Sequence, residues 1–159
     1  MNFRIGSGVD FHQLKEGRPL WLGGVQVPHH KGAVGHSDAD VLLHAICDAI
    51  LGALALGDIG KHFPDTDSSF KNIDSKILLH RTTDLMKEKG YAVVNIDSTL
   101  ILQAPKIAGY VPGMCKVISE ILGVALGDVS IKATTAEKLG FVGREEGVQA
   151  FATVLLKKD

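Results

Sequence analysis

Short stretches rich in apolar residues, several alternating with polar ones, predict β-strands in this chain. These stretches are residues 3–9, 91–103, 129–134 and 148–156. Two shorter apolar runs, Leu20–Leu22 and Val25–Val27, flank Gly23-Gly24, a dipeptide that favours a tight hairpin turn. The pattern therefore predicts a sheet and a small hairpin near the N-terminus.

Three other segments carry apolar residues at helical spacing. They are residues 38–56, residues 74–89, and a third helix that begins at 110 or 112 and ends at 122. Ser37 or Asp38 is expected to cap the first helix, because either side chain can accept a hydrogen bond from a free backbone N–H. Gly57, Gly90 and Gly123 are expected to end the three helices.

The predicted order is strand, hairpin, helix, helix, strand, helix, strand, strand. This order is typical of an α/β or α+β fold, with a mixed sheet and helices packed on one face, and we expect one domain over residues 1–159. Residues 91–103 and 129–134, joined through a helix, predict a ferredoxin-like βαβ element with a right-handed crossover. The sheet's other face is expected to be covered by self-association.

Composition narrows the class of protein. The 159 residues carry a formal net charge of −1, and this lack of a basic excess argues against nucleic-acid binding. Cys47 and Cys115 form no Cys-x-x-Cys pair, which favours a reducing compartment. No signal peptide is evident at the N-terminus, and the most apolar segment, Val41 to Leu56, is short for a membrane span. We expect a cytoplasmic protein without membrane contact.

Asp10 and His12 stand two residues apart at the predicted end of the first strand. Side chains at that spacing share one face of a strand, and both types are zinc ligands. His44, in a helix apolar nearly all round, adds a third ligand, and three protein ligands with one open position are typical of catalytic zinc. A surface Asp and His, and a hydrogen-bonded core His44, are the structural alternatives.

Two polar segments flank the first predicted helix. His36 and Ser37 can donate hydrogen bonds to an anion at the helix start, although a plain capping turn also explains Ser37. Asp58 and the stretch 63–67 form an acidic loop whose carboxylates can hold a polyol or a hard cation. Turn geometry is the alternative explanation of these Asp and Pro residues.

Polar residues also follow two predicted strands. Ala104-Pro105-Lys106 comes after one, and Lys106 can pair with a phosphate. Lys132 to Lys138 spans the end of the other, where Thr134 and Glu137 also have the spacing of a helix capping box. The chain contains no Walker A sequence and no Gly-x-Gly-x-x-Gly opening a helix, which argues against ordinary nucleotide-binding folds.

These segments together resemble the 2-C-methyl-D-erythritol 2,4-cyclodiphosphate synthase family. The matching blocks are Gly6–His12, His36–Val41, Leu56–Gly60, Phe63–Asp67, Gln103–Lys106 and Lys132–Phe141. The resemblance covers essentially the whole chain. It implies a homotrimer with active sites between subunits, zinc on Asp10, His12 and His44, and Mg²⁺ or Mn²⁺ on Glu137 with the substrate diphosphate.

The resemblance also implies roles for further residues. His36 and Thr135 would stabilise the transition state, and Phe141 and Arg144 would lie near a trimer cavity that binds an isoprenoid diphosphate. The methylerythritol end of the substrate would contact Ser37, Asp58, Ile59, Gly60, Phe63, Pro64, Asp65, Thr66 and Asp67. The cytidine and its phosphates would contact Leu102, Gln103, Ala104, Pro105, Lys106, Ile107, Ala108, Thr134 and Ala136. Ala136 stands where the family usually has Thr, Ser or Asn, so one polar contact is lost.

The implied activity is that of a metal-dependent phosphorus–oxygen lyase of the non-mevalonate isoprenoid pathway. Its substrate would be 4-diphosphocytidyl-2-C-methyl-D-erythritol 2-phosphate, whose own 2-phosphate attacks the β-phosphorus and releases CMP. No protein nucleophile is required, and positioning and charge stabilisation would supply the rate.

Two other functions remain open from the residues. A zinc-dependent hydrolase would need a general base beside the metal, for which Asp38 and Asp40 are the candidates. A non-catalytic trimeric module that binds a nucleotide or an isoprenoid diphosphate is the second alternative, and an intact metal triad argues against it.

Overall fold

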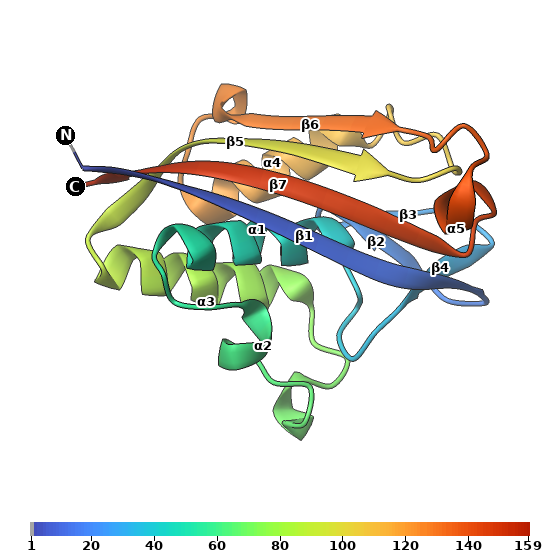
Figure 1. Cartoon of the computed structure of the whole chain (residues 1–159), viewed down its shortest axis with the longest axis horizontal. Coiled ribbons are helices and arrows are strands. Elements are labelled where there is room, and N and C mark those ends of the chain that lie inside the picture. Colours follow the sequence, from blue (N-terminus) through green and yellow to red (C-terminus); the bar gives the residue numbers. More distant parts are fainter. Residues whose placement is uncertain (1) are drawn as a thin grey trace.

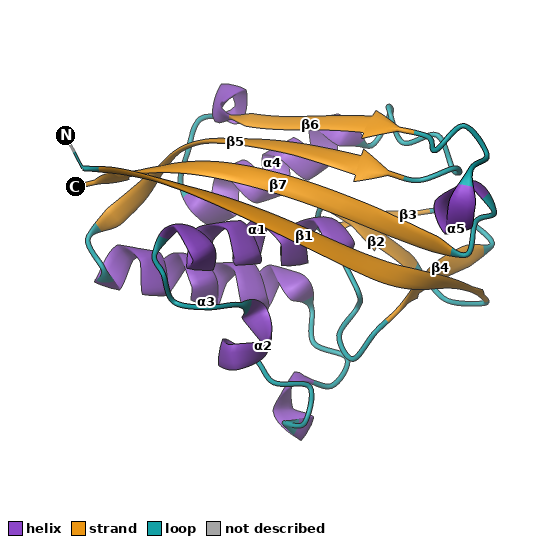
Figure 2. Ribbon diagram, viewed as in Figure 1, coloured by secondary structure: helices purple, strands orange, loops and turns teal. Residues whose placement is uncertain are grey.

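The computed structural model describes residues 2–159, and these residues form a mixed sheet with helices packed over one face (Figure 2). The strands are β1 (Phe3–Glu16), β4 (Lys31–Val34), β5 (Tyr91–Ile101), β6 (Val129–Thr134) and β7 (Gly147–Lys158). Their order across the sheet is β4-β1-β7-β5-β6, and only β5 and β6 are parallel neighbours. The predicted fold class and the βαβ unit are confirmed.

Three longer helices form the second layer of the molecule. They are α1 (Val41–Ala53), α3 (Ser75–Glu88) and α4 (Val111–Leu122), and all three lie on the same side of the sheet (Figure 1). The short elements are α2 (Ile59–His62), α5 (Gly140–Gly143), and 3₁₀ turns at Ser68–Phe70 and Leu126–Asp128. Among residues 2–159, no helix has the length and apolar character needed to cross a bilayer.

The first strand is longer than predicted, and this changes the setting of the candidate ligands. β1 runs to Glu16, so Asp10 and His12 lie inside the strand and not at its end. The strand continues because β4, a short strand that was not predicted, pairs with residues 13–16. β7 pairs with the whole first part of β1, from Phe3 opposite Lys157 to Gln13 opposite Gly147.

The two faces of β1 have different partners. Gly6 and Gly8 are buried against α1, where a Cβ on either glycine would lie 1.9 Å from a backbone oxygen, that of Ala49 and Ala45 respectively. Glycine is therefore required for this close approach of strand and helix. Asp10 and His12 continue the same face by the two-residue period, so the glycines bring both side chains up to α1.

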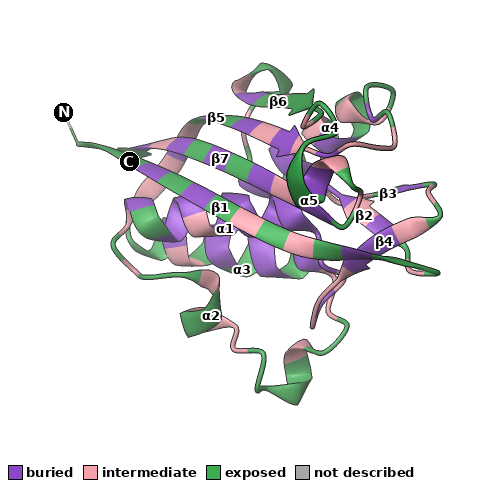
Figure 3. Cartoon of the chain, turned by 45° about the vertical axis from the view of Figure 1, so that its right-hand side comes forward, coloured by how far each residue is buried: buried purple, intermediate pink, exposed green. Residues whose placement is uncertain are grey.

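The opposite face of the sheet is not covered in the described chain. It exposes large apolar side chains on β1 and β7, and Figure 3 shows the alternation of exposed and buried residues along these strands. These residues are Phe3, Ile5, Val9, Phe11 and Phe151. The core lies on the covered face, where Leu42, Ile46 and Ile50 of α1 are fully buried.

The predicted helix bounds need three corrections. The first helix begins at Val41 with Asp40 as its N-cap, so neither Ser37 nor Asp38 caps it, and it ends at Ala53, before Gly57. No helix begins at Thr134, since the next one is α5 at Gly140, so the capping box with Glu137 is wrong. Glu137 N–H instead donates to the Thr135 hydroxyl at 3.2 Å. The second and third helices agree with the prediction within a residue or so, and Gly123 ends the latter in a left-handed conformation.

The hairpin prediction is confirmed. β2 (Leu20–Leu22) pairs with β3 (Val25–Val27) across Gly23 and Gly24. The Asp40 carboxylate accepts hydrogen bonds from the N–H groups of both glycines, at 2.9 and 2.7 Å, and from Leu43 N–H at 3.0 Å. One buried carboxylate thus caps α1 and fixes the hairpin turn beside it.

Candidate metal centre and adjoining pockets

The structure brings Asp10, His12 and His44 together at the junction of β1 and α1. Asp10 Oδ2 lies 2.9 Å from His12 Nε2 and 3.1 Å from His44 Nδ1, and the two histidine nitrogens are 3.1 Å apart. Donor atoms arranged tetrahedrally around zinc at ordinary bond lengths are roughly 3.4 Å apart. The triangle therefore has nearly the dimensions of three ligands on one ion.

The outer hydrogen bonds of the two rings decide which nitrogens are free to bind a metal. His12 Nδ1 lies 3.0 Å from the Val34 carbonyl oxygen, which can only accept, so this nitrogen carries the proton. His44 Nε2 lies 2.9 Å from Ser75 Oγ and 3.1 Å from Ser37 Oγ. With that nitrogen donating to Ser75, two nitrogen lone pairs and a carboxylate oxygen converge, and a cation satisfies all three at once.

The ionisation of Asp10 also suits this centre to a cation. Burial alone would raise the pKa of the Asp10 carboxyl, but hydrogen bonds and charge attraction from His12 and His44 outweigh it and lower the pKa to about 2. Burial works against the charged form of His12, yet the hydrogen bond that it donates to Asp10 and the negative charge of Asp10 raise the pKa of that ring. The carboxyl is thus held as the anion that a metal requires.

Ser75 and Asp38 support the centre, a role that was not predicted for either residue. The Asp38 carboxylate accepts from the Ser75 hydroxyl and, at 3.0 Å, from Ser75 N–H. The hydroxyl in turn contacts His44, so a chain of hydrogen bonds runs from Asp38 to the ligand ring. No local sequence pattern predicts the role of Ser75, because this role depends on the start of α3 lying beside α1.

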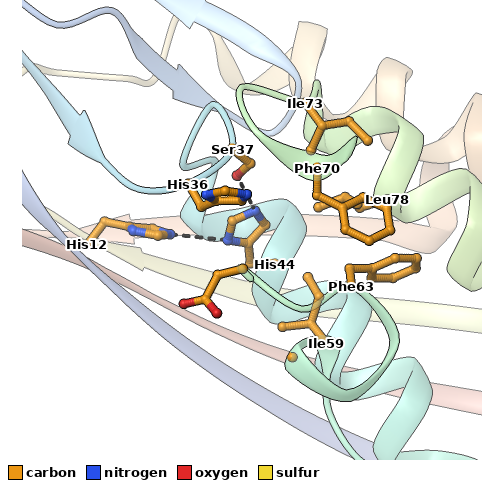
Figure 4. Close-up of a pocket in the computed structure, with 11 residues that line it drawn as sticks. His12, His36, Ser37, His44, Ile59, Phe63, Phe70, Ile73 and Leu78 are labelled. Carbon is orange, nitrogen blue, oxygen red and sulfur yellow. Dashed lines mark hydrogen bonds between the residues drawn. The ribbon is translucent and has the colours of Figure 1, made fainter. Parts of the chain in front are cut away.

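A cavity of about 340 Å³ opens beside the centre. His12, His36, Ser37 and His44 form one end of it, and Ile59, Phe63, Phe70, Ile73 and Leu78 supply an apolar side, as Figure 4 shows. Gly60 and Asp65 complete the lining. We call this cavity the metal-side pocket. It joins a polar end, suited to phosphate, to an apolar wall.

The predicted contacts to the methylerythritol end divide into two groups. Ser37, Ile59, Gly60, Phe63 and Asp65 line the metal-side pocket. Asp58, Pro64, Thr66 and Asp67 are not among its lining residues. Asp58 accepts from Lys61 N–H at 3.0 Å and Asp67 from Ser69 N–H at 2.9 Å, so in this structure both side chains shape turns. Phe70, Ile73 and Leu78 line the pocket without having been predicted.

A second cavity, of about 450 Å³, lies at the ends of the parallel strands β5 and β6. We call it the strand-end pocket. Its lining includes seven of the residues predicted to contact nucleotide, and these are Leu102, Gln103, Pro105, Lys106, Ile107, Ala108 and Thr134. Thr135, Val111, Ile131 and Ala133 also line it, whereas Ala104 and Ala136 do not. The two pockets share no lining residue.

The remaining predicted residues lie outside both cavities. Glu137 has a left-handed backbone, with φ of 53°, and its carboxylate accepts from the Thr135 hydroxyl at 3.4 Å. Phe141 packs on Phe11 with ring centroids 6.2 Å apart. The Arg144 guanidinium donates two hydrogen bonds to Glu146, at 2.9 and 3.1 Å.

Comparison with known proteins gives consistent matches over the whole described chain. Residues 3–157 match the model of the YgbB family. A 2-C-methyl-D-erythritol 2,4-cyclodiphosphate synthase from Bacteroides thetaiotaomicron is 57% identical over 159 residues and is covered in full, as is this chain. The enzyme of the same name from Bacillus cereus is 57% identical over 98% of this chain and 99% of its own.

Solved structures similar to this chain come from the same group of proteins as these relatives. The bifunctional IspDF of Campylobacter jejuni superposes with a TM-score of 0.95 at 44% identity, over 99% of this chain and 43% of that longer one. A CDP complex of IspF from Plasmodium falciparum has a TM-score of 0.88 at 37% identity, with 99% of this chain and 97% of that chain covered.

Proposed function

The chain belongs to the YgbB family, and from this premise we propose that it converts 4-diphosphocytidyl-2-C-methyl-D-erythritol 2-phosphate into 2-C-methyl-D-erythritol 2,4-cyclodiphosphate and CMP. An oxygen of the substrate's 2-phosphate bonds to the β-phosphorus, and the bond from that phosphorus to the CMP oxygen breaks. The leaving group departs with the electron pair of that bond. The protein is then a phosphorus–oxygen lyase of isoprenoid precursor synthesis.

The convergence of lone pairs from Asp10, His12 and His44 carries this proposal. Two imidazoles and a carboxylate suit zinc, and three protein ligands leave room for a substrate oxygen. Zinc held by these three residues would supply a Lewis acid and a template for the substrate's phosphate. Val34 and Ser75 hold the two rings in the tautomers that binding requires, so the chain itself sets the geometry before substrate arrives.

The metal-side pocket is the proposed site of the methylerythritol phosphate. Phe63 and Phe70, whose ring centroids lie 5.6 Å apart, exclude water from its apolar side. His36 lines the polar end, with Nε2 3.3 Å from the Asp67 carbonyl, and we assign it to stabilising charge in the transition state. Holding the 2-phosphate near the β-phosphorus makes the displacement intramolecular, which is a large source of rate.

The strand-end pocket is the proposed site of the cytidine diphosphate, the ligand class found in the Plasmodium falciparum relative. Gln103 Oε1 accepts from Lys138 N–H at 3.1 Å, which ties the segment after β6 to the end of β5. This bond supports Thr135 and Glu137 beside the pocket. We propose that Glu137 holds Mg²⁺ or Mn²⁺ with the diphosphate, and that Thr135 donates to the transferring phosphate.

A homotrimer is the proposed assembly, with each active site built between subunits. Two observations support it. The metal-side and strand-end pockets have no lining residue in common within one chain. The uncovered sheet face presents apolar side chains such as Ile5, which is 73% exposed. Packing this face against other copies buries these side chains and lets one chain's pocket face another's. Light scattering that gives a monomer mass at working concentration contradicts this assembly.

We further propose that an isoprenoid diphosphate binds near Phe141 and Arg144 in the assembled cavity. The Phe11–Phe141 pair offers apolar contact for the chain of such a ligand. Arg144 is bound to Glu146 in this structure, so a diphosphate must displace that carboxylate to reach the guanidinium. We place the reaction in the cytoplasm, where the free thiols of Cys47 and Cys115 stay reduced.

A zinc hydrolase is disfavoured by the hydrogen bonds of its two candidate bases. Both Asp38 oxygens accept from Ser75, and the fully buried Asp40 accepts from three backbone N–H groups. These contacts engage both carboxylates in holding Ser75 and the backbone, which disfavours either one as the base that takes a proton from water. The cyclase needs no such base.

The test is incubation of the protein with the cytidyl substrate and Mg²⁺, followed by phosphorus NMR. The cyclase reading requires one CMP for each cyclic diphosphate formed. CMP with a linear diphosphate indicates the hydrolase instead, and no turnover with tight CDP binding indicates a non-catalytic binding module. His44→Ala should abolish product formation, and His80→Ala, at an exposed position on α3, is the control.

A further inference from the structure

A second histidine cluster lies on the rim of the molecule, where the segment before β4 meets the turn between α5 and β7 (Figures 1 and 3). His29, His30 and Glu145 each offer one ligand atom there, and these atoms all lie within 4.8 Å of one another. The two imidazole rings meet edge to face with centroids 4.4 Å apart. None of the three residues lines the metal-side or the strand-end pocket.

The Nε2 atom of His29 gives this cluster a specific chemical need. The atom is buried and has no hydrogen-bond partner, and the whole side chain is only 10% exposed. Buried polar atoms of this kind are uncommon in folded proteins, because an unmet hydrogen bond costs free energy. The nearest carboxylate oxygen, Glu145 Oε2, lies 4.0 Å away, too far for a hydrogen bond.

That separation suits a shared ion. Two donors on opposite sides of one zinc ion lie at most about 4.2 Å apart, and tetrahedral donors about 3.4 Å apart. A small movement of the partly exposed Glu145 side chain spans the difference.

The backbone around Glu145 is fixed in the position that the cluster requires. Glu145 has φ of 56°, a left-handed conformation that non-glycine residues seldom adopt. The Lys31 ammonium donates to the Glu145 carbonyl oxygen at 3.0 Å, which ties the turn to the start of β4. This ammonium opposes a bound cation by its charge, and the Glu145 carboxylate offsets it.

We propose that His29, His30 and Glu145 form a second metal site, which binds a divalent transition metal such as Zn²⁺ or Co²⁺. Two imidazoles and one carboxylate are ligands of intermediate softness, which favours these ions over Mg²⁺ or Ca²⁺. A metal at this site clamps the segment before β4 to the turn that follows α5. It takes no part in the proposed cyclisation, so it is a structural or regulatory site.

Cobalt titration tests the proposal on the tag-free full chain after removal of metal by a chelator. Without substrate, the protein should bind two equivalents of Co²⁺, read by calorimetry and by visible absorption. His30→Ala and Glu145→Gln should each weaken one equivalent by about tenfold or more, with CMP release unchanged after reloading with zinc. His30 is exposed and Glu145→Gln is a conservative change, so both variants are expected to fold. Circular dichroism checks this.

Two matched variants separate the sites. His44→Ala should lose the other equivalent and keep the one at the rim, whereas His80→Ala should keep both. Binding of a single equivalent that His44→Ala abolishes overturns the rim site. The proposal fails equally if His30→Ala and Glu145→Gln bind two equivalents with unchanged affinity.

Discussion

The two histidine clusters have similar ligands but differ in what surrounds them. At the centre, both rings have outer hydrogen-bond partners, in Val34 and Ser75, which leave one nitrogen of each ring for a metal. At the rim, the buried Nε2 of His29, which is the nitrogen proposed to bind the metal, has no hydrogen-bond partner. The centre joins a strand and a long helix, whereas the rim joins a loop and a turn.

This difference indicates that the centre is preorganised for a metal and that the rim is less so. A ligand held by a second hydrogen bond on a rigid element binds a metal with little rearrangement. We therefore expect the centre to bind tightly and to be sensitive to its supporting residues. The rim is expected to bind more weakly and to tolerate change in its surroundings.

The largest effect is expected from His44→Ala, which removes one of the three proposed metal ligands at the centre. Cyclodiphosphate formation should fall by at least about a hundredfold, because change in a merely supporting group already lowers activity by ten- to a hundredfold in metal sites. Initial rates of CMP release measure this, alongside zinc content. Near-normal activity would contradict the comparison, since a change at the centre would then affect catalysis no more than a change at the rim.

Gly8→Ala tests whether the approach of β1 to α1 builds the centre. The added Cβ would lie 1.9 Å from the Ala45 carbonyl oxygen, so strand and helix must separate. We expect a loss of about 3 kcal/mol in the free energy of unfolding, together with weaker zinc binding. Urea unfolding measures the first quantity. Gly109→Ala, where nothing lies within 4 Å of the added atom, is the control and should be near neutral.

The pH dependence of the metal-free protein tests the charge of the centre. The pKa of Asp10 falls from 3.8 to about 2 on folding, so its stabilisation is present above pH 3.8 and is lost as the pH falls toward 2. Ionised Asp10 therefore contributes about 2 kcal/mol to the free energy of unfolding at neutral pH. The pKa of His12 is raised above 6.5, so its contribution is lost as the pH rises through that raised value.

Urea unfolding in the presence of a chelator, repeated across this pH range, measures both effects. The loss of stability at low pH is the acid limb, and the loss at higher pH is the His12 limb. Asp10→Asn should flatten the acid limb and, by removing the carboxylate partner, the His12 limb as well. An acid limb of equal depth in that variant would show that other carboxylates produce it.

Ser75→Ala removes the acceptor that fixes the His44 tautomer. Zinc affinity should fall by about tenfold, with a matching fall in kcat/KM. Competition with a chromophoric chelator measures the affinity. Ser68→Ala, on the exposed 3₁₀ turn, should leave it unchanged. If both variants bind zinc like the parent, outer hydrogen bonds do not distinguish the two clusters.

The smallest effect is expected at the rim. Glu145→Gly relieves the left-handed backbone at φ of 56° and should raise the free energy of unfolding by about 0.5–1 kcal/mol. The same variant should lose the proposed rim metal. Glu145→Gln, which keeps the strained backbone, is the matched control and should show the metal loss without the gain in stability.

Much of the fold was predictable because its signals are local. Gly23-Gly24 predicts the hairpin, and alternation predicts β5 to β7, since each signal depends on residues that are neighbours in sequence. The end of β1 was not predictable in this way. Residues 13–16 stay extended because β4 pairs with them, and β4 itself is only four residues long.

The site was predictable to a similar degree. Asp10, His12 and His44 were identified from residue type and resemblance, and the structure brings their ligand atoms together. The expected helix over residues 38–56 includes Asp40, but Asp40 instead caps the helix and holds the hairpin turn. Ser75 was missed because its contact with His44 is made between two helices. Residue roles set by tertiary contact leave no trace in local spacing.

The pairing of β1 with β7 has a consequence for how the chain folds. Phe3 lies opposite Lys157, so two of the three proposed ligands lie on a strand whose partner is the last strand to be synthesised. Closing so large a loop is slow, and it must precede the ordered sheet. A chain still emerging from the ribosome therefore cannot build its centre, and metal loading is expected only after release. Pulse-labelled nascent chains stalled before residue 147 should bind no zinc at Asp10 and His12.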